Sequence, residues 1–130
     1  MKTNIVNQDW NTTFVIGKSR QSWLFEDGHI FTSASGAAIN SYQQHSVEII
    51  LEGHAETTSA DPYGAIDSLG RKAMVIVTET GTIDAGHTGI ALHGRNSEID
   101  NRGSIEGDRH GIYATGDGLY ISNLGFISGG

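Results

Sequence analysis

Three carboxylates occupy equivalent places in a Gly-x-aliphatic step that recurs along this 130-residue chain. Glu56, Asp84 and Glu106 each lie three residues after the glycine of such a step. If neighbouring strands of one parallel sheet carry the steps, the three side chains form an outward column with a spacing of about 5 Å. Like charges in such a column need a compensating cation, a raised pKa or exposure to solvent.

This column is compatible with two kinds of chemistry. Two carboxyl groups about 5 Å apart suit the acid and the nucleophile of a glycosidase, and His87, Arg109 and His110 fall nearby in the repeat, where they would orient or neutralise an acidic sugar. Oxygen ligands from Glu56, Asp84 and Glu106 would also suit calcium. A solvated surface without chemistry is the third interpretation.

The amino-acid composition argues against several other kinds of site. The chain has no cysteine, which excludes disulfides, thiolate nucleophiles and cysteine-ligated zinc. A net charge of −7, with eight Lys and Arg residues spread along the sequence, argues against a nucleic-acid partner. His29 and His54 are expected at the same outward position in adjacent repeats, but a metal site would need a third ligand in matching register. No cofactor is therefore expected, apart from the calcium alternative.

Glycine spacing shows what would position these side chains. The Gly-x-aliphatic steps begin at Gly28, Gly53, Gly81, Gly103 and Gly125, so they are 25, 28, 22 and 22 residues apart. A second glycine follows four of them, at Gly36, Gly64, Gly89 and Gly111. The residue four places before each step is aliphatic, which predicts that it faces a core: Leu24, Ile49, Val77, Ile99 and Ile121.

Side chains around each step alternate with period two, as in strands buried on one face. Repeats of 22 to 28 residues built from such strands predict an all-β, single-stranded parallel β-helix of about five coils, and the repeat length favours the right-handed form. We expect coils over residues 23–130, with residues 1–22 as an N-terminal cap or an incomplete first coil. Asn101 and Asn123 should stack, and residues 59–63 should form a loop outside the ladder.

An outward column of unusual apolar character is also expected. Counting back from the repeated glycines places Trp23, Phe25, Ile50 and Ile76 together on one outer face. Such a patch is normally covered. The cover would be the N-terminal segment with Trp10 and Phe14, another copy of the chain, or a foreign partner.

The pattern Ile-x-Asn-x-Gly-x-Ile-x-Gly, at residues 99–107 and again at 121–129, resembles repeats of exported bacterial β-helix proteins. Autotransporter passenger regions, filamentous adhesins and type I-secreted repeat proteins carry such repeats. The resemblance covers about residues 24–130 and implies the fold and a secreted or cell-surface location, although Met1 to Gly17 lacks the features of a signal peptide. It implies no activity, because unrelated functions share this scaffold.

Two functions from different classes follow. The first is a structural or interaction module of an exported bacterial protein that self-associates, is adhesin-like and has no activity of its own. The alternative is a carbohydrate-active or carbohydrate-binding module, similar to polysaccharide lyases, hydrolases or epimerases, that uses the carboxylate column; short loops between the strands argue against a long substrate cleft. The last repeat stops in mid-coil, so we also expect the chain to be a portion of a longer repeat protein or to pair with a neighbour there.

Overall fold

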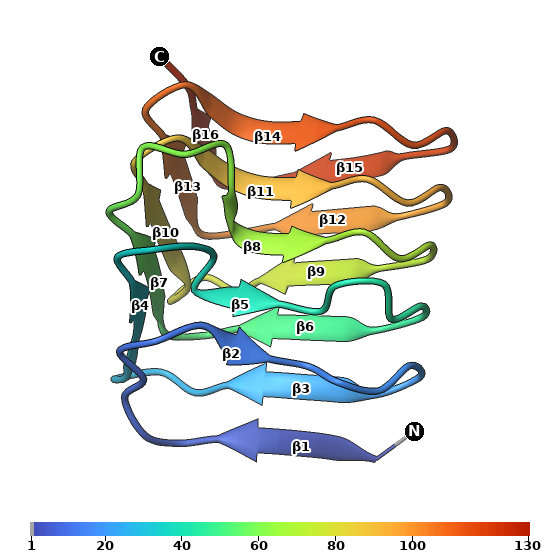
Figure 1. The fold of residues 1–130 in the computed structure, drawn as a ribbon, viewed down its shortest axis with the longest axis horizontal. Coiled ribbons are helices and arrows are strands. Elements are labelled where there is room, and N and C mark those ends of the chain that lie inside the picture. The colour runs from blue at the N-terminus through green and yellow to red at the C-terminus, as the bar shows by residue number, and fades with distance from the viewer. Residues whose placement is uncertain (1) are drawn as a thin grey trace.

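The computed structural model describes residues 2–130, and within them it contains sixteen β-strands and no helix. The strands form three parallel sheets, A, B and C, through which the chain winds about five times (Figure 1), so the prediction of a parallel β-solenoid is confirmed. Sheet A contains β1 (Thr3–Val6), β3 (Ser22–Phe25), β6 (Glu48–Leu51), β9 (Met74–Val77), β12 (Glu98–Asn101) and β15 (Tyr120–Asn123). Sheet B contains β4 (Ile30–Ser33), β7 (His54–Thr57), β10 (Thr82–Ala85), β13 (Ser104–Gly107) and β16 (Phe126–Ser128). Sheet C contains β2 (Phe14–Val15), β5 (Ile39–Asn40), β8 (Gly64–Ser68), β11 (Thr88–Leu92) and β14 (His110–Ala114).

Columns of aliphatic side chains fill the space between the sheets. On sheet A, Ile49, Val75 and Ile99 stack in register, and each is almost completely buried. Sheet C supplies Ile66 and Ile90 in the same way. One coil has no second layer to cover its apolar face, so stacking of equivalent residues is what creates this core.

Aromatic rings fill the core near the first coils. Phe14 packs edge-on against Trp10, Trp23 and Phe25 at centroid distances of 4.8, 5.1 and 5.2 Å, and Phe25 packs against Phe31 at 5.1 Å. Both Phe25 and Phe31 are fully buried. The expected outward position of Trp23 and Phe25 is therefore wrong, because both side chains point into the core.

A register slip at the first glycine explains this error. Ile30 pairs with His54, and His54 pairs with Thr82, so His29 and not Gly28 occupies the place of Gly53 and Gly81. Because side chains alternate along a strand, a slip of one residue exchanges the two faces. Leu24, expected inside, consequently lies on the outer face.

The recurring glycine at the A-to-B turn is a steric requirement. A Cβ atom at Gly103 would overlap the carbonyl oxygen of Gly81 in the preceding coil, and one at Gly125 would overlap that of Gly103. Close approach of stacked backbones selects glycine at these turns, since a side chain has no room between the coils.

Two predicted local features are confirmed at the turns. The amide of Asn101 donates a hydrogen bond to Oδ1 of Asn123 at 2.9 Å, and each Asn oxygen accepts the N–H of the glycine two residues later. Residues 59–63 lie outside the ladder in the connection from β7 to β8, whereas only residues 86–87 connect β10 to β11. Near the start of the chain, β1 pairs with β3, Trp10 bridges to Phe31, and β2 pairs with β5, so residues 3–15 follow the path of the later coils.

Candidate functional site

The carboxylate column forms as a row on the outer face of sheet B. Asp84 on β10 pairs in register with Glu56 on β7 and with Glu106 on β13. The side chains of Asp84 and Glu106 are exposed, and Glu56 is half-buried, with its Oε1 3.4 Å from Nε2 of His54. Among residues 2–130 there is no group of three or more His, Asp or Glu side chains arranged to hold a metal ion. The column is an open row of separate carboxylates on a flat surface.

His87, Arg109 and His110 do come together, but away from that row. They line a depression of about 490 Å³ at the corner between sheets B and C, and a second one of about 630 Å³ adjoins it on the same three residues. The rings of His87 and His110 have centroids 6.0 Å apart. None of Glu56, Asp84 and Glu106 lines either depression. The predicted six-residue set is thus divided between two places.

The depression of about 490 Å³, which we call the histidine groove, has further walls that the sequence pattern does not predict. Its further lining residues are Pro62, Thr88, His93 and Tyr113. Tyr113 stacks on His110 at 5.3 Å with an interplanar angle of 29°, and it packs edge-on to His93 at 6.2 Å. One signal was present in the repeat, because Thr88 and His110 open equivalent strands and pair in register.

A buried carboxylate lies next to the histidine groove. Asp67 on β8 is in register with Ala91 and, through it, with Tyr113 on β14. Its Oδ2 accepts the backbone N–H of Gly64 at 3.0 Å. Desolvation by burial raises the pKa of Asp67, and the Gly64 hydrogen bond and the charge of His93 oppose the rise.

The pairing of His29 with His54 is not formed. His29 lies in the turn before β4, where its Nδ1 is 3.3 Å from Oδ1 of Asp9. Asp9 also accepts the N–H of Ile30 at 2.9 Å, and this backbone hydrogen bond is the main cause that lowers the pKa of Asp9. His54 contacts the Thr82 hydroxyl at 2.6 Å on the next strand. The same register slip that moved Trp23 separates these two histidines.

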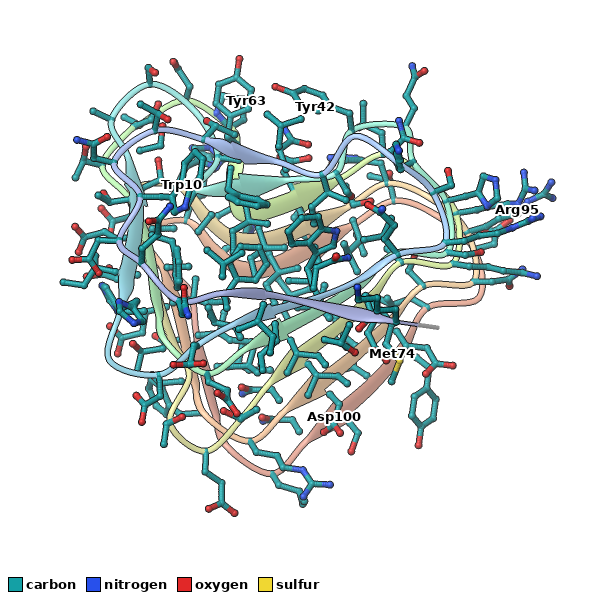
Figure 2. All side chains as sticks on the ribbon, turned by 90° about the horizontal axis from the view of Figure 1, so that it is seen from below. Trp10, Tyr42, Tyr63, Met74, Arg95 and Asp100 are labelled. Atoms are coloured by element: carbon teal, nitrogen blue, oxygen red, sulfur yellow. The ribbon has the colours of Figure 1, made fainter. Side chains whose placement is uncertain are left out.

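The outer face of sheet A carries an apolar column. Leu24, Ile50 and Ile76 follow one another in register on β3, β6 and β9, and Ile5 on β1 extends the row, with 57% of its surface exposed. Asp100 on β12 ends the column and points away from the core (Figure 2). Ile50 and Ile76 therefore lie on one outer face as predicted, and Leu24 and Ile5 lie there in place of Trp23 and Phe25.

The expected intrachain cover of this face is absent within residues 2–130. Trp10 bridges to β4 of sheet B, and Phe14 pairs with Ile39 of sheet C and points into the core. Both aromatic residues pack against buried groups, so neither lies over the column of Leu24, Ile50 and Ile76. The outer face of sheet A is open.

Comparisons of the chain with protein-family models, with curated proteins and with solved structures find no match. Over the part of the chain that the structure describes, no helix is long and apolar enough to cross a membrane. The parallel β-solenoid is accordingly established from the chain's own strand pairing.

Proposed function

We propose that this chain is a structural interaction module that associates with copies of itself through the outer face of sheet A. The observation that carries the proposal is the uncovered aliphatic column of Ile5, Leu24, Ile50 and Ile76. Burial of apolar surface is favourable by about 25 cal/mol per Å², and contiguous exposed patches mark interaction sites. The resemblance of the repeat to exported bacterial proteins supports a setting outside the cell.

Symmetry favours a second copy as the occupant. The column has four equally spaced rungs, so a two-fold axis between Leu24 and Ile50 brings each of them onto the other in the partner. The same axis brings Ile5 onto the partner's Ile76. One surface patch then serves both copies, which is the property of an isologous dimer interface.

The test is molar mass by light scattering over a concentration series at about 500 mM salt, which screens contacts between charged surfaces. Wild-type chain should change from monomer to dimer as concentration rises, equally with calcium and with a chelator. Ile50→Glu should hold it as a monomer, because the charge would be buried at the centre of the patch. Ile30→Glu is the matched control, since Ile30 is exposed on sheet B, and it should leave the dimer intact. A wild-type monomer at every concentration would remove the proposal.

A second candidate function, binding of an acidic glycan, is favoured by the histidine groove. Tyr113 stacked on His110 offers a flat ring for a sugar face, and Arg109 offers a planar donor fork for a carboxylate. Because no member of the carboxylate column lines the groove, this geometry favours binding over turnover of the glycan.

Titration calorimetry with oligogalacturonate tests this candidate. We expect heat of binding from wild type, and at least a tenfold loss of affinity in Arg109→Ala and in Tyr113→Ala. Glu106→Gln should bind like wild type, and Tyr120→Ala, at an exposed tyrosine on sheet A, is the control for loss of an aromatic ring. Weaker binding by Glu106→Gln would instead assign the glycan to the carboxylate column, and no heat from wild type would exclude the candidate.

A further inference from the structure

Positive charge is concentrated on one edge of the solenoid. Five of the eight Lys and Arg residues lie in the turns that join sheet C to sheet A, and all five are exposed: Lys18, Arg20, Arg71, Lys72 and Arg95. Figure 2 shows Arg95 on this edge, where nitrogen-bearing side chains gather. These residues look scattered in the sequence because three different coils contribute them, and the turn at residues 41–47 contributes none. We call this edge the basic ridge.

Repeated backbone geometry aligns the ridge. The residue two places before each sheet A strand has a positive φ of 55–73° in five successive turns: Arg20, Ser46, Lys72, Asn96 and Gly118. The N–H of Arg20, Ser46, Lys72 and Asn96 donates to the next coil at 2.8–3.0 Å, to the carbonyl oxygens of His45, Arg71, Arg95 and Asp117. The hydrogen-bond ladder therefore continues around the edge and holds equivalent side chains one above another.

The ridge has a single counter-charge among the described residues, Asp117, which lies one rung beyond Arg95. No ion pair within residues 2–130 includes any of its five cations, and Asp117 is the only acidic residue in these turns. Arg71 and Lys72 lie one rung from Arg95, about 4.8 Å away, a distance at which like charges on neighbouring strands repel. The net charge of the chain is −7, so most of the remaining surface has the opposite sign. A partner with negative groups at a matching spacing would relieve this repulsion.

The same chain presents such a surface on its opposite side. Sheet B faces away from the edge that joins sheets C and A, because each sheet of a three-sided solenoid lies across from the edge joining the other two. Its outward row of Glu56, Asp84 and Glu106 has the same rise from coil to coil as the ridge. A copy placed alongside with its axis parallel would set Asp84 beside Arg71 and Lys72 and Glu106 beside Arg95. Glu56 would then face the turn at residues 41–47, which carries no Lys or Arg.

We propose that the basic ridge of one copy docks on the carboxylate row of a second copy, so that solenoids line up side by side. This contact joins two different surfaces, and a heterologous contact of this kind repeats without closing. Rows of molecules are thus the product, in contrast to the closed dimer through sheet A. The inference shares with the proposed function the idea of self-association, but it uses other residues.

Paired charge-reversal variants test the docking. The ridge variant carries Arg71→Glu, Lys72→Glu and Arg95→Glu, and the row variant carries Glu56→Lys, Asp84→Lys and Glu106→Lys. By light scattering at about 20 mM salt, wild type should form assemblies larger than a dimer that dissociate at about 500 mM salt, where the Debye length is only a few ångströms. Each variant alone should form none, and an equimolar mixture of the two should form them again.

A control separates specific docking from general charge attraction. Lys2→Glu, Arg102→Glu and Arg109→Glu together change the net charge as much as the ridge variant does, but they lie off the ridge. This control should assemble alone and should gain nothing from the row variant. Assembly should also persist in the Ile50→Glu background, so the failure of one contact is separable from failure of the other. A mixture of ridge and row variants that stays unassembled would overturn the inference, as would wild type that binds oligogalacturonate through the ridge without assembling.

Discussion

At the scale of single residues, the fold shifts the pKa of two carboxyl groups in opposite directions, by burial in one and by a hydrogen bond in the other. Asp67 lies beneath the outer face of sheet C, and burial raises its pKa, whereas the hydrogen bond from the Ile30 N–H lowers the pKa of exposed Asp9. The fold therefore favours the protonated form of Asp67 and the ionised form of Asp9. Asp67 is the stronger subject for experiment because its carboxylate is removed from solvent.

Replacement of Asp67 by Asn should stabilise the protein at neutral pH. The stabilising contribution of protonated Asp67 is intact below the unfolded pKa of about 3.9 and is lost as pH rises through the raised folded value. An asparagine keeps an oxygen for the Gly64 N–H without the charge. We expect Asp67→Asn to have the higher urea midpoint at pH 7 and no advantage at pH 3.

Exposed Asp84→Asn is the control for this experiment. It should show no comparable pH-dependent gain, because its side chain stays in solvent in the folded state. A lower midpoint for Asp67→Asn at pH 7 would mean that its charged form stabilises the fold, through His93.

At the scale of elements, the turns decide how strands stack. The A-to-B turns differ in length: residues 26–29 and 78–81 are longer than residues 52–53, 102–103 and 124–125, yet the strands after them stay in register. In the four later turns, glycine at the closing position lies against the backbone of the coil before it, whereas His29 closes the first. The length of the turns is thus variable, whereas the separation between the backbones of neighbouring coils is constant.

Replacement of Gly103 by Ala should cost about 1–3 kcal/mol of unfolding free energy. Its Cβ would overlap the carbonyl oxygen of Gly81, and the coils would have to move apart to admit it. Gly17→Ala is the matched control, because a Cβ there has no atom within 4 Å, and its change should stay below about 1 kcal/mol. Urea denaturation of both variants measures the difference; equal values would contradict the close-approach explanation.

Some side-chain positions in these strands and turns were predictable from the sequence, and others were not. The Asn101–Asn123 stack was predictable because its two members are 22 residues apart, which is the length of one repeat. The carboxylate row was predictable because its three members lie at the same distance from a glycine. The positions of Trp23 and Phe25 were not, since Gly28 stands one residue away from the equivalent of Gly53. No local pattern distinguishes the two registers there, and the pairing of Ile30 with His54 settles it.

At the scale of the whole molecule, stability is distributed along the stack of coils. Ile99 on β12 and Ile121 on β15 occupy the same column, one rung apart. Ile99 lies between two coils and is 1% exposed, whereas Ile121 on the last described sheet A strand is 41% exposed. In a stacked architecture each coil contacts only its neighbours, so the number of covered sides sets the contribution of a core residue.

The same substitution at these two positions should therefore differ in cost. Ile99→Ala should destabilise by about 3 kcal/mol, in the range for a large-to-small change in a packed core. Ile121→Ala should cost less than half of that, because the lost side chain is partly in water already. Urea unfolding monitored by circular dichroism gives both values, and an equal loss would show that the last coil is as tightly packed as the centre.

The sequence by itself determined the architecture: strands of period two, interrupted by glycine at 22 to 28 residues, can bury their apolar faces only by stacking in a parallel β-solenoid. Tertiary structure decided which distant residues meet. The histidine groove, the apolar column with Leu24 and the basic ridge each combine residues from several coils. Periodicity is local and survives turns of unequal length, but the register between coils does not follow from it, because hydrogen bonding and packing between neighbouring coils set that register.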